Sequence, residues 1–177
     1  MNFFYLTSLN NQVGNFSERI KMKKFLFTTI SFLFISMTAF ANDNQDALNT
    51  FYNYVKAANS YSNSVADFYS PSAKIIRQVI KPDGTTKNAY TDTATYLKQM
   101  KIGQAGAKLK QYKNSYTNVG VTPISAGKVK ISSVRHPSCD NDSLKTYMIF
   151  QKQGDGKWVI VEEMMQTRQQ IFLKYAK

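Results

Sequence analysis

An arginine interrupts an apolar segment early in the chain, and its position suggests a binding site. The segment 73–81 (AKIIRQVIK) is rich in β-branched residues and predicts a strand. Side chains alternate between the two faces of a strand, so Arg77 shares a face with Ile75 and Val79. A buried charge must be paired with an acid or held by a ligand. The segment therefore predicts either an internal ion pair or an anion-binding position at Arg77, with Ile75 and Val79 as candidate ligand-binding residues beside it.

A second arginine and a pair of glutamates are the other charged candidates. Arg135 ends a predicted strand over 128–135, where alternation groups it with Val129, Ile131 and Ser133. Glu162 and Glu163 point to opposite faces of the last predicted strand, so one of them can face inward.

We take Glu162 as the inward candidate. An internal Arg–Glu pair, rim residues in water and ligand binding are the three alternatives.

Tyrosines are frequent, and two of them are candidates for a pocket wall. Tyrosine suits a wall that has one apolar end and one hydrated end. Tyr52, on the predicted first helix, and Tyr69, just before the first strand, are the residues we assign to that role. Ordinary half-buried packing explains most of the other tyrosines.

Several kinds of site find no support in the sequence. His136 and Cys139 are the only histidine and cysteine, and two side chains fall short of a zinc site. No phosphate-binding glycine loop or Ser-His-Asp set is present, so we predict no metal, no cofactor and no catalytic residue. The net charge is +12, of which residues 1–41 supply +3 and the remainder +9. This charge favours anionic partners, but no nucleic-acid-binding module accompanies it.

The N-terminus predicts export. Lys23 and Lys24 precede an apolar run over 25–35, and the segment ends in the Ala-x-Ala pattern at Ala41. These are the parts of a secretory signal in their usual order. The run is too short for a membrane anchor, which takes about 20 apolar residues.

We therefore expect residues 1–21 to be an over-extended start and 22–41 to be a signal peptide. Cleavage is expected between Ala41 and Asn42, leaving a single domain over 42–177 in the periplasm or the medium.

The remaining pattern is typical of an α+β domain. A helix is predicted over 46–68 with a break near Asn59, and a second helix starts from a cap at Thr91 or Asp92 and ends before Lys110. Four strands are predicted at 112–122, 128–135, 144–152 and 157–166, with a short helix at 171–175. Trp158 is expected to be buried in the last strand.

Three stretches of this domain resemble the nuclear-transport-factor-two-like (NTF2-like) superfamily, which includes SnoaL-like proteins and ketosteroid isomerase. They are the first helix leading to 67–75 (DFYSPSAKI), the turn 82–84 (PDG) before the second helix, and 154–163 (GDGKWVIVEE). The resemblance implies a cone-shaped fold with N-terminal helices packed on a curved antiparallel sheet, and a pocket between them. It implies no particular reaction, since enzymes, ligand binders and assembly modules share the fold.

The family's known catalytic positions are not matched here. The carboxylate of isomerase-like members falls at or beside Arg77, and an arginine cannot act as a base near neutral pH. Dehydratase-like members use pocket histidines, and only His136 exists. The leading hypothesis is an exported, non-catalytic domain that binds a small amphipathic, anionic ligand. The alternatives are an isomerase-, cyclase- or dehydratase-type enzyme with an atypical residue set, and a module that forms homodimers through the outer sheet face.

Overall fold

The computed structural model describes residues 42–176. The predicted signal peptide over 22–41, the predicted extra start over 1–21 and the cleavage residue Ala41 lie outside the described residues. The described residues form one compact unit. No helix among the described residues is long and apolar enough to cross a membrane.

The described part of the chain begins in a long helix over residues 42–59. Its buried side chains recur at steps of three and four, which places them on one face; they are Ala47, Phe51 and Tyr54. A short 3₁₀ helix, η1 (Asn63–Phe68), follows. The Ser62 hydroxyl caps η1 by accepting a hydrogen bond from the Ser64 amide at 3.1 Å. The predicted break near Asn59 thus separates two distinct helices.

Six strands form one curved sheet in the order β2-β1-β6-β5-β4-β3. Their bounds are β1 Tyr69–Ile80, β2 Thr86–Thr91, β3 Asn114–Ser125, β4 Lys128–Pro137, β5 Leu144–Lys152 and β6 Trp158–Thr167. The sheet is mixed, because β1 pairs with β6 in parallel while every other neighbouring pair is antiparallel. The sheet expected from the sequence was antiparallel throughout, and the β1–β6 pair corrects that detail.

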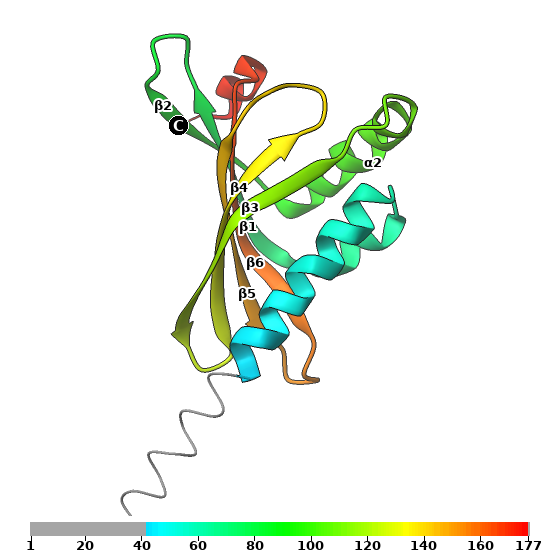
Figure 1. Cartoon of the computed structure of the whole chain (residues 1–177), viewed down its shortest axis with the longest axis vertical. Helices are drawn as coiled ribbons and strands as arrows, with labels where there is room; N and C mark the ends of the chain where they lie inside the picture. Colours follow the sequence, from blue (N-terminus) through cyan, green and yellow to red (C-terminus); the bar gives the residue numbers. More distant parts are fainter. Residues whose placement is uncertain (1–41, 177) are drawn as a thin grey trace, which may run out of the picture. The chain divides into compact units, whose positions relative to one another are not determined.

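The second helix, α2 (Thr93–Leu109), lies on the same side of the sheet as the N-terminal helix (Figure 1). The Asp92 carboxylate caps it by accepting a hydrogen bond from the Thr95 amide at 2.8 Å. The buried Thr93 hydroxyl donates to the Ala73 carbonyl at 2.7 Å and ties the start of α2 to β1. A second 3₁₀ helix, η2 (Gln170–Tyr175), ends the described chain.

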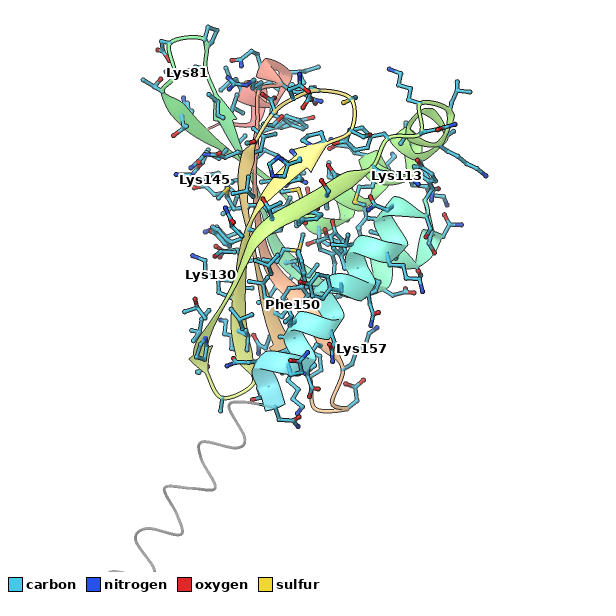
Figure 2. The ribbon with its side chains drawn as sticks, viewed as in Figure 1. Lys81, Lys113, Lys130, Lys145, Phe150 and Lys157 are labelled. Atoms are coloured by element: carbon cyan, nitrogen blue, oxygen red, sulfur yellow. The ribbon has the colours of Figure 1, made fainter. Side chains whose placement is uncertain are left out.

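The hydrophobic core fills the space between the helices and the concave side of the sheet. Phe51 on the first helix and Phe150 on β5 are both fully buried there. Figure 2 shows Phe150 between the sheet and the first helix, whereas Lys130 and Lys145 project from the opposite face. Trp158 is buried in the same core at the start of β6, which confirms the prediction for it.

The α+β class is confirmed, and β2 is the element that sequence reasoning missed. Its segment TKNAYT shows no apolar alternation, and only Ala89 within it is buried. The strand forms because a tight turn folds it back onto β1: the Lys81 amide donates to the Thr85 carbonyl at 2.8 Å. Gly84 in that turn has a φ of 81°, a conformation that glycine adopts without strain.

Candidate functional site

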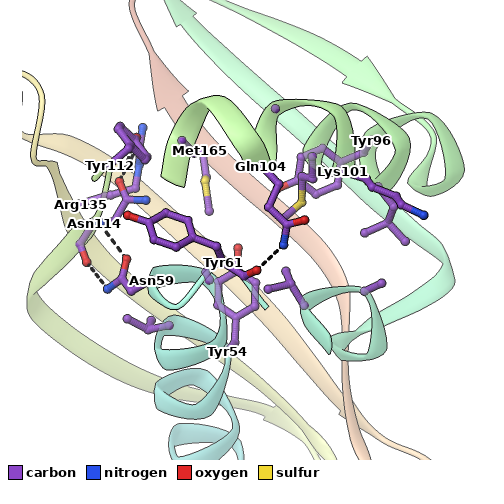
Figure 3. Close-up of a pocket in the computed structure, with 18 of the residues that line it drawn as sticks. Tyr54, Asn59, Tyr61, Tyr96, Lys101, Gln104, Tyr112, Asn114, Arg135 and Met165 are labelled. Carbon is purple, nitrogen blue, oxygen red and sulfur yellow. Dashed lines mark hydrogen bonds between the residues drawn. The ribbon is translucent and has the colours of Figure 1, made fainter. Parts of the chain in front are cut away.

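A cavity of about 800 Å³ lies between the helices and the sheet. This volume falls within the roughly 300–1,000 Å³ that is usual for small-molecule sites. The first helix supplies Tyr54 and Asn59, α2 supplies Tyr96, Met100 and Gln104, and the sheet supplies two arginines. Figure 3 shows Tyr54, Tyr96 and Arg135 around this cavity. The two arginines, Arg77 and Arg135, have different surroundings.

Arg77 belongs to a closed network around a buried carboxylate. The Glu163 side chain is 0% exposed. One of its oxygens accepts a hydrogen bond from Arg77 Nη1 at 2.7 Å, and the other accepts one from the Tyr69 hydroxyl. Both carboxylate oxygens are therefore occupied inside the protein, and Glu163 does not line the cavity.

Two further tyrosines complete this network. The hydroxyl oxygens of Tyr54 and Tyr69 lie 3.1 Å apart, within hydrogen-bonding distance. The Tyr96 ring stacks on the guanidinium of Arg77, with Cζ 4.7 Å from the ring centroid. Burial, followed by the nearby charge of Glu163 and the other tyrosine rings, raises the pKa of Tyr69 well above its usual value. Burial is also the largest cause of the raised pKa of Tyr54 and of Tyr96.

Arg135 is buried without a carboxylate partner among the described residues. The residue is 9% exposed. Its Nη1 donates to the Tyr112 hydroxyl at 3.0 Å and to Asn114 Oδ1 at 2.9 Å, while Nη2 donates to the Gln166 carbonyl at 3.1 Å. These acceptors are all neutral, so the charge of Arg135 is not compensated by them. Its Nε is buried and has no hydrogen-bond partner within residues 42–176.

A pair of asparagines fixes one side of the Arg135 group. Asn59 Nδ2 donates to the Asn114 carbonyl, and the Asn114 amide donates to Asn59 Oδ1, both at 2.9 Å. This double hydrogen bond joins the end of the first helix to the start of β3. It leaves Asn114 Oδ1 free to accept from Arg135 and from Tyr112, the latter at 3.1 Å.

Tyr61 is a second polar group in the cavity with an unused hydrogen-bonding atom. Its hydroxyl is buried and lacks a partner among the described residues. The Tyr61 carbonyl accepts a hydrogen bond from Gln104 of α2, which holds this residue against the cavity (Figure 3). The Tyr61 ring extends toward the side of the cavity where Asn114 and Arg135 lie (Figure 3).

The charge of the cavity wall is positive. Four cationic side chains line it: Arg77, Arg135, Lys98 and Lys101. None of the described residues that line it is an aspartate or a glutamate. Within residues 42–176 no three His, Cys, Asp or Glu side chains are grouped so as to hold a metal ion. The wall is therefore suited to hold an anion.

The structure brings some of the residues predicted for the site together and separates others. Arg77 and Arg135 both line the cavity. Ile75 and Val79 share a face of β1 with Arg77 and are buried, but they do not line the cavity that was expected to include them. Tyr69 lies behind the wall and contacts two residues that line it, Tyr54 through the hydroxyl groups and Tyr96 through an edge-to-face ring contact.

Two predicted positions need correction. Tyr52 is 51% exposed and lies away from the cavity, because the buried stripe of the first helix runs through Phe51 and Tyr54. Glu162 lies on the outer face of the sheet, where it accepts a hydrogen bond from the Tyr147 hydroxyl at 2.6 Å and pairs with Lys74 at 3.8 Å. Its neighbour Glu163 is the inward acid, as strand alternation allowed.

The polar groups around Arg135 were not identified from the sequence. Asn59 and Asn114 carry no motif, and they are 55 residues apart in the chain. In the neighbouring network, Tyr54 and Tyr96 could be recognised as aromatic residues of two helices, but not as members of one group around Glu163. Alternation along β4 was the one sequence pattern that identified a member of the Arg135 group, because it placed Arg135 on the inner face of the sheet.

Comparison with known proteins gives the fold a name. No family model matches the sequence, and no curated protein matches it. An NTF-2-like protein of unknown function from Shewanella oneidensis has a similar structure, with a TM-score of 0.54 at 14% identity over 70% of this chain and 98% of that one. The fold is NTF2-like.

Other solved structures agree with the NTF2-like fold. A protein with a cystatin-like fold from Caulobacter vibrioides superposes with a TM-score of 0.54 at 10% identity, covering 71% of this chain and 89% of that one. A protein from Shewanella frigidimarina with the provisional name of ketosteroid isomerase gives 0.50 at 14% identity, covering 66% and 91%. At such low identities the similarity shows a shared fold and assigns no reaction.

Proposed function

We propose that this chain is an exported, non-catalytic binding domain whose cavity holds a small amphipathic anion. The observation that carries the proposal is Arg135, a buried cation that faces only neutral acceptors within the described domain. Burying an uncompensated charge is costly, and an anionic ligand would remove that cost. Arg135 and Tyr61 both line the cavity, and each keeps one buried hydrogen-bonding atom that no other described residue satisfies.

The rest of the wall supports an amphipathic ligand. Val55, Leu97, Met100 and Phe172 contribute apolar side chains to the cavity wall. A carboxylate is the simplest head group that matches a guanidinium, since the two form parallel hydrogen bonds. The proposed ligand class is therefore a small carboxylate with an apolar body.

Titration calorimetry with dodecanoate tests this proposal, with octanol as an uncharged probe. We expect dodecanoate to bind and octanol to bind more weakly. Arg135→Met should weaken dodecanoate binding roughly ten- to a hundredfold, because a hydrogen bond to a charged group contributes about 1.5–3 kcal/mol.

The matched control is Arg168→Met, since Arg168 is an exposed arginine paired with Asp142 at 2.8 Å outside the cavity. Equal affinities of wild type and Arg135→Met would contradict the proposal.

An isomerase-type enzyme is the second candidate, and the Tyr54–Tyr69–Glu163 chain is the observation that favours it. Tyr54 lines the cavity, and the chain connects it to a buried carboxylate. The raised tyrosine pKa values disfavour proton release from this chain near neutral pH, and Arg77 occupies the other oxygen of Glu163. Incubation with a β,γ-unsaturated ketone separates the two candidates. If wild type converts the ketone to its conjugated isomer and Glu163→Gln does not, the enzyme is favoured.

A module that forms homodimers through the sheet is the third proposal. The outer sheet face carries polar contacts, such as Lys130 over the Tyr147 ring at 4.3 Å and the hydrogen bond from Tyr147 to Glu162. The most exposed large apolar side chains of the described domain lie elsewhere, on α2 and η2. Size-exclusion chromatography with light scattering measures the oligomeric state directly, and Tyr147→Lys would disrupt a dimer formed through this face.

A further inference from the structure

The outer face of α2 carries large apolar side chains in contact with solvent. Ile102 is 73% exposed and Leu109 is 86% exposed, the two highest values among the large apolar residues of the described domain. Ala105 lies between them and is exposed as well. Residues at these steps of three and four share one side of a helix, so the three side chains form a stripe. The opposite side of α2, with Tyr96 and Met100, lines the cavity.

Lysines border this stripe. Lys98, Lys101 and Lys108 are exposed on α2, and no aspartate or glutamate occurs from Thr93 to Cys139. Within residues 42–176 none of the three lysines forms an ion pair. Lys98 and Lys101 also line the cavity, so the basic border reaches its rim. An uncompensated basic surface attracts an anionic partner.

The combination of exposed apolar and basic side chains narrows the class of partner. A nucleic acid would need basic residues but would gain nothing from Ile102 and Leu109. A helix that lies on an anionic membrane uses both, with apolar side chains entering the acyl boundary and lysines contacting head groups. We propose that the outer face of α2 docks on an anionic lipid surface. This docking surface is defined by Lys98, Lys101, Ile102, Ala105, Lys108 and Leu109.

The docking surface also places the cavity close to the membrane. One side of α2 faces the lipid and its other side forms a wall of the cavity. A ligand passing between bilayer and protein would then cross the rim at Lys98 and Lys101. The docking proposal itself rests on the outer side of α2 and does not require the carboxylate ligand proposed above.

Vesicle flotation tests the docking surface. The full-length chain is expressed, and the purified protein is mixed with phosphatidylcholine vesicles with or without phosphatidylglycerol. We expect binding to the anionic vesicles that falls as salt is added, because salt screens exposed charges. The apolar segment 25–35, if retained, contributes equally to all variants, so the docking surface is measured by differences between variants.

The variants separate the apolar and basic contributions. The double variant Ile102→Asn with Leu109→Asn should lose binding by roughly tenfold or more, because two apolar side chains no longer enter the bilayer. Lys108→Gln, which lies outside the cavity wall, should lose about fivefold, because a basic residue at an anionic surface contributes about 1 kcal/mol.

Two matched controls should bind like wild type. They are Ile124→Asn, at the exposed end of β3, and Lys130→Gln, on the outer sheet face.

Three outcomes would overturn the docking proposal. The first is a wild-type protein that does not bind anionic vesicles at low salt. The second is an equal loss of vesicle binding in the α2 variants and in the controls. The third is a wild-type dimer that the double variant converts to a monomer, since that would make the stripe an interface between copies. Dodecanoate binding by the folded double variant tests the two proposals separately. If only the docking proposal fails, both wild type and the double variant still bind dodecanoate. If the cavity proposal fails, neither protein binds it.

Discussion

The two arginines of the cavity show that burial alone does not mark a binding residue. Arg77 and Arg135 are equally buried, at 9% exposed each, and both line the cavity. Arg77 pairs with Glu163 and stacks on Tyr96, so its charge is already compensated. Arg135 meets only neutral acceptors and keeps one donor unused. The comparison assigns Arg77 mainly to stability and leaves Arg135 as the residue that we propose to bind the ligand.

The largest expected effect comes from breaking the Arg77 network. Arg77→Met should lower the free energy of unfolding by about 3–5 kcal/mol, because Glu163 is left buried without its partner. Urea unfolding followed by Trp158 emission measures this change.

The double variant Arg77→Met with Glu163→Met should recover much of the lost stability, since an apolar pair of similar volume can replace a buried ion pair. An unchanged unfolding midpoint in Arg77→Met would contradict the assignment of Arg77 to stability.

The ligand should stabilise the protein through Arg135 and not through the exposed Arg168. At a hundredfold excess over its dissociation constant, dodecanoate should raise the free energy of unfolding by about 2.7 kcal/mol in wild type. Thermal melting should show this increase in Arg168→Met as well, and a much smaller one in Arg135→Met at the same ligand concentration. A full increase in Arg135→Met would place the anion elsewhere in the cavity.

The tyrosines of the Arg77 network should make the fold sensitive to alkali. Burial raises the pKa of Tyr54, Tyr69 and Tyr96 above the ordinary value of 10.0. Above that pH the unfolded chain loses these protons while the folded protein keeps them, so unfolding becomes more favourable. Their stabilising contribution is therefore complete below pH 10 and is lost as the pH rises toward the folded-state values.

Melting temperatures measured on both sides of pH 10 test this sensitivity. Tyr96→Phe keeps the ring over Arg77 and removes one ionisable hydroxyl, so its alkaline loss of stability should be smaller than that of wild type. Tyr52→Phe is the control, because Tyr52 is largely exposed and lies outside the network. An equal alkaline loss in all three proteins would show that the buried tyrosines do not cause it.

The smallest expected effect concerns α2, which forms a wall of the cavity. Gly106 lies within this helix, and a Cβ atom at that position would meet nothing within 4 Å. Gly106→Ala should therefore stabilise the protein by about 0.5–1 kcal/mol, because glycine loses more backbone freedom in a helix than alanine does. Chemical denaturation measures the gain, and a destabilised variant would mean that α2 relies on flexibility at this residue.

The sequence predicted most of the helices and strands, and it predicted the two arginines of the candidate site but not the groups around them. Apolar periodicity indicated both long helices and the long strands, and alternation placed Arg77 and Arg135 on the inner face. Alternation could not decide between Glu162 and Glu163, because that choice depends on how β6 is set against β1. It also could not show that Asn59 meets Asn114, or that β2 exists, because both depend on contacts formed only after folding.

The parallel pairing of β1 with β6 has a consequence for the order of folding. The strand nearest the start of the domain pairs early with β2, but its second partner, β6, is made only near the end of the chain, and the Arg77–Glu163 contact joins residues 86 positions apart. Contacts of such long range slow folding, because a large loop must close before they form. A chain interrupted before β6 would have β1 paired with β2 on one edge only, and its Arg77 would lack the Glu163 carboxylate. The six-stranded sheet therefore cannot be completed until its last strand has been synthesised.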